Sequence, residues 1–544
     1  MFYRNRFLKS RADRFLKSGA TGIKDDEMTG NTNTRPLSLD LKENLHQIIQ
    51  ELGNSPDVKI REFQIAGQFQ AAAVFIDNLI DKKVVDDFVM RSLMIDTANE
   101  TFKSMVSEKN VLEFIIDNAL SMGEVQVIKD WNGLMLSFLS GETVILFNGS
   151  AEAISGDTRS VGGRAVTEPS SQVVIRGPKD GFTESIATNV SLIRQRIKSS
   201  NLWLEPMIIG HVTHTTVAIM YIKGIVNDKL VQEVKQRLND IQIDGILESG
   251  YIEELIQDHP FSPFPTVYNT ERPDVVVGNL LEGRISILVD GTPFVLILPS
   301  TFFMYFQSVE DYYQRFDIGI AIRLLRYVAL FISLLGPSIY VAAVTFHQEM
   351  MPTSLLISLA AQREGVPFPA FVEAFLMETS FEILREAGVR MPRAIGQAVS
   401  IVGALILGEA AVQAGIVSSA MVIVVAITGI ASFVTPTFNM AISVRLLRFV
   451  LMFFAASFGF YGIAIIAIMI TGHLCSLRSF GVPFMAPLAP FIPADQKDAV
   501  LRLPLWSFLT RPRLISQNNM VRMKPDSRPS VPKENKTKGN MDES

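Results

Sequence analysis

The sequence predicts an α/β amino-terminal region followed by an all-α polytopic membrane domain of four to six transmembrane helices. The chain has 544 residues, enough for three or four domains of about 150 residues each. Its mean hydropathy of +0.26 is high for a soluble protein, and the apolar excess lies between Tyr327 and Gly472. These observations exclude a purely soluble enzyme, a secreted disulfide scaffold and a disordered tail protein.

Changes in composition divide the chain into five parts. They are a basic leader at 1–40, a first α/β subdomain at 41–190, a second at 191–316, a transmembrane domain at 317–495 and a basic tail at 496–544. Within the α/β region, apolar spacing predicts a helix over 41–52, and an apolar run predicts a buried strand over 143–147. Asn227 is expected to cap another helix, and Asp290-Gly291 between two apolar runs predicts a β-hairpin.

The basic leader contains a short repeat. Arg6-Phe7-Leu8-Lys9-Ser10 recurs eight residues later from Arg14 to Ser18, which brings the Phe and Leu residues near one helical face. An amphipathic arm on anionic lipid and a solvated, disordered leader are both compatible with this pattern.

Long apolar segments predict the transmembrane helices. Tyr327 to Phe346 gives 20 uncharged residues, which at a 1.5 Å rise cross about 30 Å of hydrocarbon. Between Ala394 and Val444 the one ionisable side chain is Glu409, so this stretch predicts two crossings, near 395–412 and 415–434. Further candidates are 449–472, the acidic segment 354–384 and the segment 479–494 with its four prolines.

Positive charges predict the orientation, because Lys and Arg near the ends of spans favour the cytoplasm. Basic residues at 323–326, in expected loops at 385–393 and 445–448, and in the tail indicate that the α/β region and the carboxyl end are cytoplasmic. The acidic segment 354–384 must then cross, and the number of crossings is even. It is six if 479–494 crosses, whereas four or five remain open if a weak segment is interfacial or re-entrant.

Charged side chains inside a bilayer are costly, so the intramembrane acids are candidate functional residues. Glu409 follows a helix rich in small residues, and an apolar ring beside an acidic ring would conduct cations and close by dewetting. The pore and gate candidates are Ser400, Val402, Ile406 and Glu409. The alternative is that Glu409 ends the span at the interface and the small residues only pack. The coupling candidates are Glu373, Glu378, Glu382 and Arg385, where Arg385 can pair with Glu378 or Glu382 on one helical face.

The sequence contains no catalytic constellation, so we expect no enzyme activity, cofactor, metal site or nucleic-acid partner. A phosphate-binding glycine loop, a metalloprotease histidine pair and a nucleophile elbow are all absent, and Cys475 is the single cysteine. Two polar clusters in the α/β region are candidate contacts for an anion or, alternatively, for a neighbouring domain. Their members are Arg176, Lys179, Asp180, Glu271, Arg272 and Asp274.

Several long motifs resemble one family. They are Glu168-Pro169, VIRGPKDGFTE at 174–184, TERPD at 270–274, LVDGTPF at 288–294, QREGVPFP at 362–369 and REAGVRMP at 385–392. In this order they are similar to motifs of the A subunits of bacterial spore germinant receptors, the GerA-type spore germination proteins, from about residue 41 to 493. Length and basic leader are most similar to the KA-type subunits.

The resemblance implies a multi-pass protein of the spore inner membrane that contacts lipid and works with a transporter-like B subunit and a lipoprotein C subunit. It also implies a homo-oligomer of A subunits that forms or gates an ion channel, which opens when a partner subunit binds nutrient and so starts germination. Three alternatives remain: a sporulation paralogue acting beside the dipicolinate channel, a pure scaffold, and a secondary transporter with broken helices, for which Gly336-Pro337 is a candidate interruption.

Overall fold

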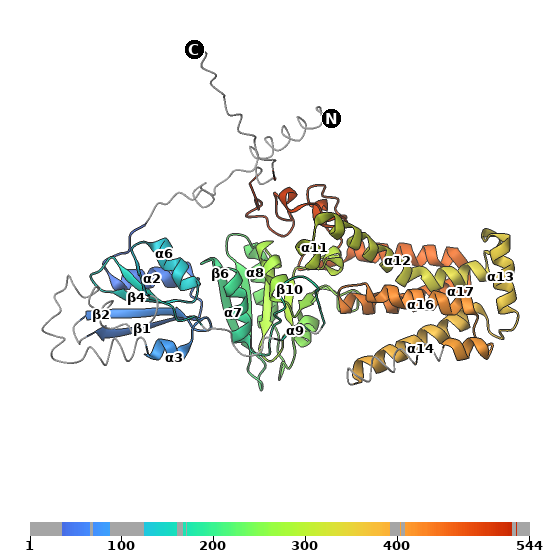
Figure 1. The fold of residues 1–544 in the computed structure, drawn as a ribbon, viewed down its shortest axis with the longest axis horizontal. Helices are drawn as coiled ribbons and strands as arrows, with labels where there is room; N and C mark the ends of the chain where they lie inside the picture. The colour runs from blue at the N-terminus through green and yellow to red at the C-terminus, as the bar shows by residue number, and fades with distance from the viewer. Residues whose placement is uncertain are drawn as a thin grey trace, which may run out of the picture.

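The computed structural model describes residues 35–65, 69–87, 125–159, 167–169, 171–391, 403, 408–524 and 529. In Figure 1 the two α/β subdomains and a bundle of long helices follow one another along an elongated molecule. The leader up to residue 34 and the last part of the tail lie outside the described residues.

The first subdomain is an antiparallel five-stranded sheet in the order β1-β2-β4-β5-β3. Its strands are β1 Val58–Ile65, β2 Phe69–Ile76, β3 Val125–Ile128, β4 Thr143–Phe147 and β5 Ala153–Gly156. Helices α2 (Leu41–Glu51) and α6 (Trp131–Leu139) share one apolar core with the sheet, and the short α3 is Lys82–Val85. The predicted helix over 41–52 and strand over 143–147 are therefore observed.

The second subdomain is a three-layer α/β/α unit. Its sheet has the order β6-β7-β9-β10-β8, with β6 Leu202–Ile209, β7 Thr215–Ile222, β8 Tyr268–Thr270, β9 Ile285–Val289 and β10 Val295–Leu298. Alternate strand residues point to two separate cores, one shared with α7 (Ile186–Arg196) and α10 (Pro273–Leu281), the other with α8 (Asp228–Asn239) and α9 (Ser249–Ile256). The hairpin at Asp290-Gly291 and the cap at Asn227 are observed as predicted.

The boundary between the two subdomains lies earlier than expected. Residue 190 falls inside α7, and Phe182, Val190 and Ile193 are buried in a core of the second subdomain. A buried ion pair between Arg194 of α7 and Asp57 of the first subdomain joins the two units, with both side chains at most 3% exposed. We therefore begin the second subdomain before Phe182.

Beyond the second subdomain lies the helix bundle. After η4 (Phe302–Phe306) and α11 (Glu310–Tyr313), it contains α12 Phe316–Thr345, η5 Gln348–Met350, α13 Thr353–Arg363, α14 Ala370–Arg390, α16 Ser419–Phe433 and α17 Phe438–Ser476. Helices α12 and α17 are long and apolar enough to cross a membrane, while α13 lies across the far end of the bundle in Figure 1. Pro337 lies inside a continuous α12, so the interruption expected of a broken transporter helix is not found at Gly336-Pro337.

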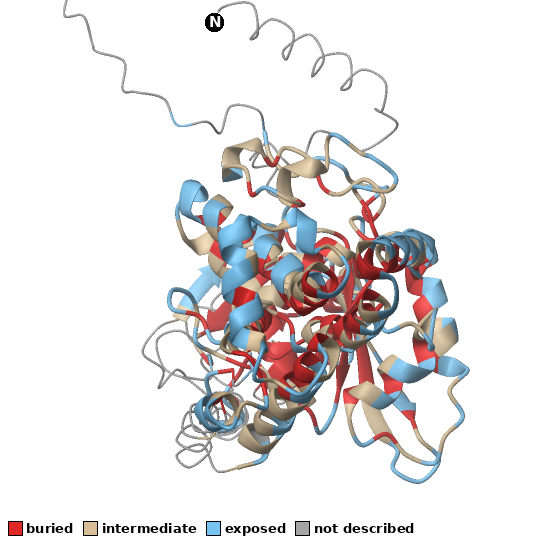
Figure 2. Cartoon of the chain, turned by 90° about the vertical axis from the view of Figure 1, so that its right-hand side faces the viewer, coloured by how far each residue is buried: buried red, intermediate tan, exposed pale blue. Residues whose placement is uncertain are grey.

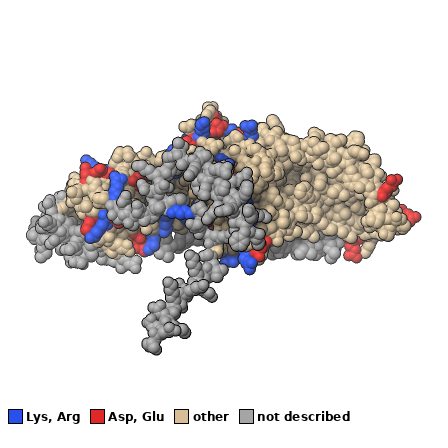
Figure 3. All heavy atoms as spheres, turned by 90° about the horizontal axis from the view of Figure 1, so that it is seen from above, with Lys and Arg blue, Asp and Glu red and all other residues tan. Residues whose placement is uncertain are grey.

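The surface of the bundle differs from that of the α/β region. On the face shown in Figure 3, charged side chains gather over the α/β region and reappear only at the far end of the bundle. Seen from that end in Figure 2, the helices keep exposed faces around a buried centre. These exposed faces carry large apolar side chains, among them Phe331, Phe453 and Ile468. Such a surface is typical of lipid contact.

Helix α17 is a helical hairpin. At Gly459 the backbone takes a φ of +58°, which interrupts the helix. Met440 and Leu474, near the two ends of α17, are buried in the same core of the second subdomain. Gly459 itself packs against His347, just beyond the far end of α12. The two halves therefore run antiparallel, each along the length of the bundle.

The segment 479–494 does not form the crossing that was considered for it. Its residues form turns and a short ladder of β11 (Arg478–Ser479) with β12 (Val482–Pro483), and Phe484 is buried in the core of the second subdomain. The four prolines explain this, because each removes a backbone donor that a helix needs.

The tail then continues through η6 (Gln496–Asp498) and η7 (Leu505–Ser507). Beyond these elements it packs on the second subdomain. Ser516 Oγ donates to the carbonyl oxygen of Ile225, and Asn518 Nδ2 donates to that of Val226. The described part of the tail is thus a strap on the second subdomain.

Candidate functional site

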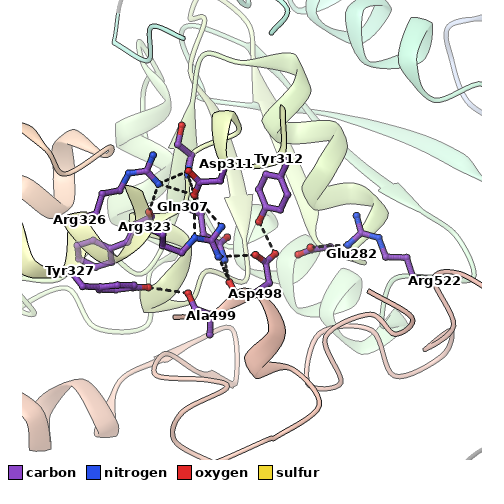
Figure 4. A network of polar contacts seen from close by, with 12 residues as sticks. Glu282, Gln307, Asp311, Tyr312, Arg323, Arg326, Tyr327, Asp498, Ala499 and Arg522 are labelled. Carbon is purple, nitrogen blue, oxygen red and sulfur yellow. Dashed lines mark hydrogen bonds and ion pairs between the residues drawn. The ribbon is translucent and has the colours of Figure 1, made fainter. Parts of the chain in front are cut away.

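Four charges join the α/β region to the first long helix, and we call them the junction cluster: Asp311, Arg323 and Arg326, which are buried, and Asp498, which is half-buried (Figure 4). Arg323 and Arg326 are three residues apart on α12, so they share one face, and Asp311 of α11 accepts from both. The distances are 3.1 Å from Nε and Nη2 of Arg323 and 2.8 Å from Nη1 of Arg326, all to Asp311 Oδ2.

Asp498 brings the carboxyl-terminal segment into the cluster. Its Oδ1 accepts from Arg323 Nη1 at 2.8 Å, and its Oδ2 accepts from the Tyr312 hydroxyl at 2.6 Å. Burial raises the pKa of Asp498 above its ordinary value, and the guanidinium of Arg323 opposes this. Buried charges are tolerated when each has a partner, so separating α11, α12 and this segment would leave charges uncompensated.

A cavity of about 520 Å³ lies beside the junction cluster. Arg326, Tyr312 and the start of α10 line it on one side, and the turn at 433–436 between α16 and α17 lines it on another. A turn between two bundle helices therefore faces the α/β region.

The two polar motifs of the α/β region contact each other. Arg272 is buried, pairs with Asp274 at 2.7 Å and donates to the carbonyl oxygen of Pro178 at 2.9 Å. The backbone carbonyl of Glu271 accepts from Phe182 N at 2.7 Å. Segments about 90 residues apart are thus joined.

The remaining members of these motifs lie around that contact. Lys179 is exposed and pairs with Glu168 at 2.8 Å, and Asp180 pairs with Arg196 of α7. Arg176 is exposed, and its backbone nitrogen donates to Glu310 of α11. These contacts pack the loop against adjoining elements, and a contact with an anion or with a neighbouring domain stays a prediction.

Three carboxylates at successive turns of α14, which we call the acidic ladder, are Glu373, Glu378 and Glu382. Glu373 pairs with Arg363 of α13 at 3.3 Å and accepts from Ser418 Oγ, at the start of α16, at 2.9 Å. At the other end of α14, Glu382 pairs with Arg385 at 3.2 Å.

The middle step of the acidic ladder is the most enclosed. Glu378 pairs with Arg448 of α17, and both side chains are 0% exposed. Arg448 also donates to Ser333 Oγ of α12 at 3.2 Å. Glu382 pairs additionally with Arg445 of α17 at 2.9 Å. The ladder therefore ties α14 to α12, α13, α16 and α17.

Two arginines have a different place from the one expected. Arg445 and Arg448 were expected in a cytoplasmic loop, but they lie inside α17, and Arg448, not Arg385, is the partner of Glu378. One sequence feature could have indicated that Arg445 and Arg448 lie in the helix. They are three residues apart at the start of a long apolar run, as are Arg323 and Arg326. No local pattern in the sequence indicates that Asp311 and Asp498 are the partners of Arg323 and Arg326.

The pore candidates are only partly within the structure. Ser400, Val402 and Ile406 lie outside the described residues. Glu409 is exposed and accepts a hydrogen bond from Gln413 at 3.0 Å. Within the described ranges, no group of three or more His, Cys, Asp or Glu side chains is placed to hold a metal ion.

Comparison with known proteins gives consistent matches along most of the chain. Residues 46–514 match the family described as Bacillus/Clostridium GerA spore germination protein. The chain is 53% identical to spore germination protein KA of Bacillus subtilis, over 91% of this chain and 90% of that protein. It is 39% identical to spore germination protein GerLA of Bacillus cereus, over 89% and 99% of the two chains.

A solved structure is also similar. The N-terminal domain of the A subunit of the Bacillus megaterium spore germinant receptor GerK3 matches half of this chain and 98% of its own, with 43% identity and a TM-score of 0.40. The sequence matches are decisive by their length and identity. The chain therefore belongs to the A-subunit family of spore germinant receptors, and this membership implies a role in spore germination.

Proposed function

We propose that this protein is a non-enzymatic A subunit of a nutrient germinant receptor in the spore inner membrane. It works with a transporter-like B subunit and a lipoprotein C subunit. Copies of the chain assemble into a ring that forms or gates an ion channel, and nutrient binding on a partner opens it. The observation that carries the proposal is family similarity from residue 46 to 514, which spans both the α/β region and the helix bundle.

We propose six membrane crossings, with the α/β region and the tail on the cytoplasmic side. Helix α12 runs away from the second subdomain, and α14 and α16 each run back towards it. The first half of α17 runs away from the second subdomain and the second half runs back. Arg390 ends α14 near the α/β region, whereas Ser418 starts α16 at the far end beside Glu373. We therefore assign the remaining crossing to the predicted segment 395–412, most of which lies outside the described residues.

Gating requires two arrangements that a partner subunit stabilises to different extents. The junction cluster and the acidic ladder are suited to couple them, because their charges lie between elements that would move relative to one another. The gate itself is assigned to residues 395–412, with Val402 and Ile406 as the apolar constriction and Ser400 and Glu409 as polar lining.

The first test measures ion release from dormant spores after addition of nutrient mixtures. Deletion of the chain should abolish nutrient-triggered release. Val402→Ala should cause spontaneous release, because a smaller side chain widens the constriction. Val450→Ala, on the exposed side of α17, is the matched control and should leave release unchanged.

Each contrary outcome has a distinct meaning. Intact nutrient responses after deletion would favour the sporulation paralogue or a scaffold. Normal dormancy of Val402→Ala would place the gate elsewhere. Saturable uptake by the isolated chain in liposomes would favour a secondary transporter.

A second test separates pore lining from coupling. Glu409→Gln should lower cation selectivity without loss of assembly, and an unaltered permeability ratio would assign Glu409 to the end of its span. Asp498→Asn should reduce nutrient-triggered release while the subunit still assembles, because Arg323 keeps Asp311 and the backbone carbonyl of residue 498 but loses the negative charge on the carboxyl-terminal segment. Asp317→Asn removes an exposed partner of Arg315 on the same helix and should have no effect.

A further inference from the structure

A loop of the second subdomain presents a fully exposed aromatic side chain beside the helix bundle. Phe261 is 100% exposed, although its neighbours in the chain are held in place. Ser262 Oγ lies 2.9 Å from His473 Nε2, and the carbonyl oxygen of Pro263 accepts from Ser443 Oγ. His473 and Ser443 stand at the two ends of α17 that meet the α/β region. The loop is therefore fixed where the exposed apolar surface of the bundle begins.

A second loop reaches the same level from the carboxyl-terminal segment. Ala489 packs on the core that also receives Leu330 of α12 and Leu447 of α17. On either side of it, Leu488 is 44% and Phe491 67% exposed. This is the proline-containing segment that sequence alone left open as a crossing, and Leu488 and Phe491 are its exposed large apolar side chains, whereas Phe484 and Met485 are buried.

We propose that these two loops form an interfacial anchor, in which Phe261, Leu488 and Phe491 insert into the boundary between lipid headgroups and acyl chains. The proposal rests on the membrane crossings proposed above for α12 and α17. Lipid is the expected occupant because both loops adjoin the emerging ends of these helices, and Phe and Leu are among the side chains that interfacial segments bury at the boundary between headgroups and acyl chains. Moving such a side chain from water into an apolar environment is favourable.

The anchor gives the α/β region a fixed height above the bilayer. Arg323, Arg326 and Asp498 lie in the same junction, so an anchored second subdomain can move laterally or rotate but is not free to lift away. A rigid connection of this kind would transmit a movement of the α/β region to α12.

The test uses the full chain with Cys475→Ser, which removes the native exposed thiol. Single cysteines at Phe261 and Phe491 carry nitroxide labels, and the protein is reconstituted in phosphatidylcholine–phosphatidylglycerol vesicles. Accessibility to oxygen, which concentrates in lipid, is compared with accessibility to a water-soluble nickel chelate. Val212→Cys, 75% exposed in the turn between β6 and β7, is the aqueous control. Ile468→Cys on α17 is the lipid control.

We expect the oxygen-to-nickel ratio at Phe261 and Phe491 to be several-fold that at Val212 and to approach that at Ile468. A ratio equal to that at Val212, with Ile468 in lipid, overturns the anchor and leaves the crossings intact. Protection from both reagents at Phe261 and Phe491 overturns it in favour of a protein contact. An aqueous ratio at Ile468 itself would refute the proposed membrane crossing of α17.

Discussion

At the scale of single residues, buried charges dominate the helix bundle and its junction with the α/β region. Each of the arginines Arg323, Arg326 and Arg448 is buried and has a carboxylate partner on another element. Two opposite charges removed from water interact strongly, but the desolvation of each is of similar size. Such pairs therefore specify which elements meet more than they add to stability.

Removing one partner of the most enclosed pair should be strongly destabilising. Glu378→Gln leaves the guanidinium of Arg448 buried without a counter-charge, and we expect a loss of about 3–5 kcal/mol in unfolding free energy. The double variant Glu378→Leu with Arg448→Met should recover most of it, since no charge then remains. Thermal unfolding of the detergent-solubilised chain measures both.

The control for the Glu378 variants lies on the same helix, α14. Glu386 pairs with Arg390, and both side chains are mostly exposed. Glu386→Gln should change the unfolding free energy by at most about 1 kcal/mol. Equal effects of Glu378→Gln and Glu386→Gln would show that the buried pair is not maintained in the folded chain.

A carboxylate in the second subdomain should make stability depend on pH. Burial raises the pKa of Glu253 from 4.5 to about 7, opposed by a hydrogen bond from Asn269 and assisted by the charge of Glu248. Between these two pH values the folded state keeps a proton that the unfolded state has lost. This contribution to stability is therefore complete below pH 4.5 and declines as the pH rises to 7, by about 3 kcal/mol at most.

Glu253→Gln should remove that dependence and be the more stable form at pH 8. Unfolding by urea at pH 5 and pH 8, followed by the fluorescence of Trp203 in strand β6 of the same subdomain, compares the two chains. If the unfolding free energy depends on pH in the same way in Glu253→Gln and in the unsubstituted protein, Glu253 is ionised in the folded protein.

At the scale of elements, the sequence predicted local features well and contacts between distant segments poorly. The β9–β10 hairpin and the α8 cap follow from adjacent residues, so they could be predicted. The apolar run at 449–472 predicted one crossing, because a glycine within an apolar helix does not reveal a reversal of direction. Only the backbone angles at Gly459 and the contact with His347 show that α17 is a hairpin.

The same limit applies to the candidate site. Spacing predicted that Glu378, Glu382 and Arg385 share a face, and the Glu382–Arg385 pair is observed. The pairing of Glu378 with Arg448 depends on how α14 and α17 pack, and no local pattern contains that information.

The turn of α17 should tolerate no side chain at Gly459. A Cβ there would lie 2.6 Å from His347 Cε1 and 3.0 Å from Phe346 Cβ, and the positive φ is strained for other residues. We expect Gly459→Ala to lower the unfolding free energy by about 1–3 kcal/mol. Gly472→Ala, with open space around a helical position, should instead be neutral or stabilising by up to about 1 kcal/mol. Melting temperatures in detergent that fall equally for both would argue against the hairpin.

At the scale of the whole molecule, the hairpin of α17 keeps the number of proposed crossings even, although 479–494 does not form a helix. The second subdomain receives the start of α12, both ends of α17 and the tail strap. All of these connections meet at one end of the bundle, and α13 with the Gly459 turn occupies the other. With the proposed crossings, this arrangement predicts which residues face opposite sides of the membrane.

Labelling from the two sides of the membrane tests this arrangement. Cys475 is exposed just before the end of α17 and is the single native cysteine, so an impermeant maleimide should reach it only from the side of the α/β region. In a Cys475→Ser chain, Tyr461→Cys lies just past the Gly459 turn at an exposed position and should react only from the opposite side. Only 14 residues separate positions 461 and 475, about 21 Å of helix, so opposite labelling requires that the second half of α17 cross most of the bilayer. Reaction of both positions from one side would rule out the hairpin as two crossings and reduce the even count to four.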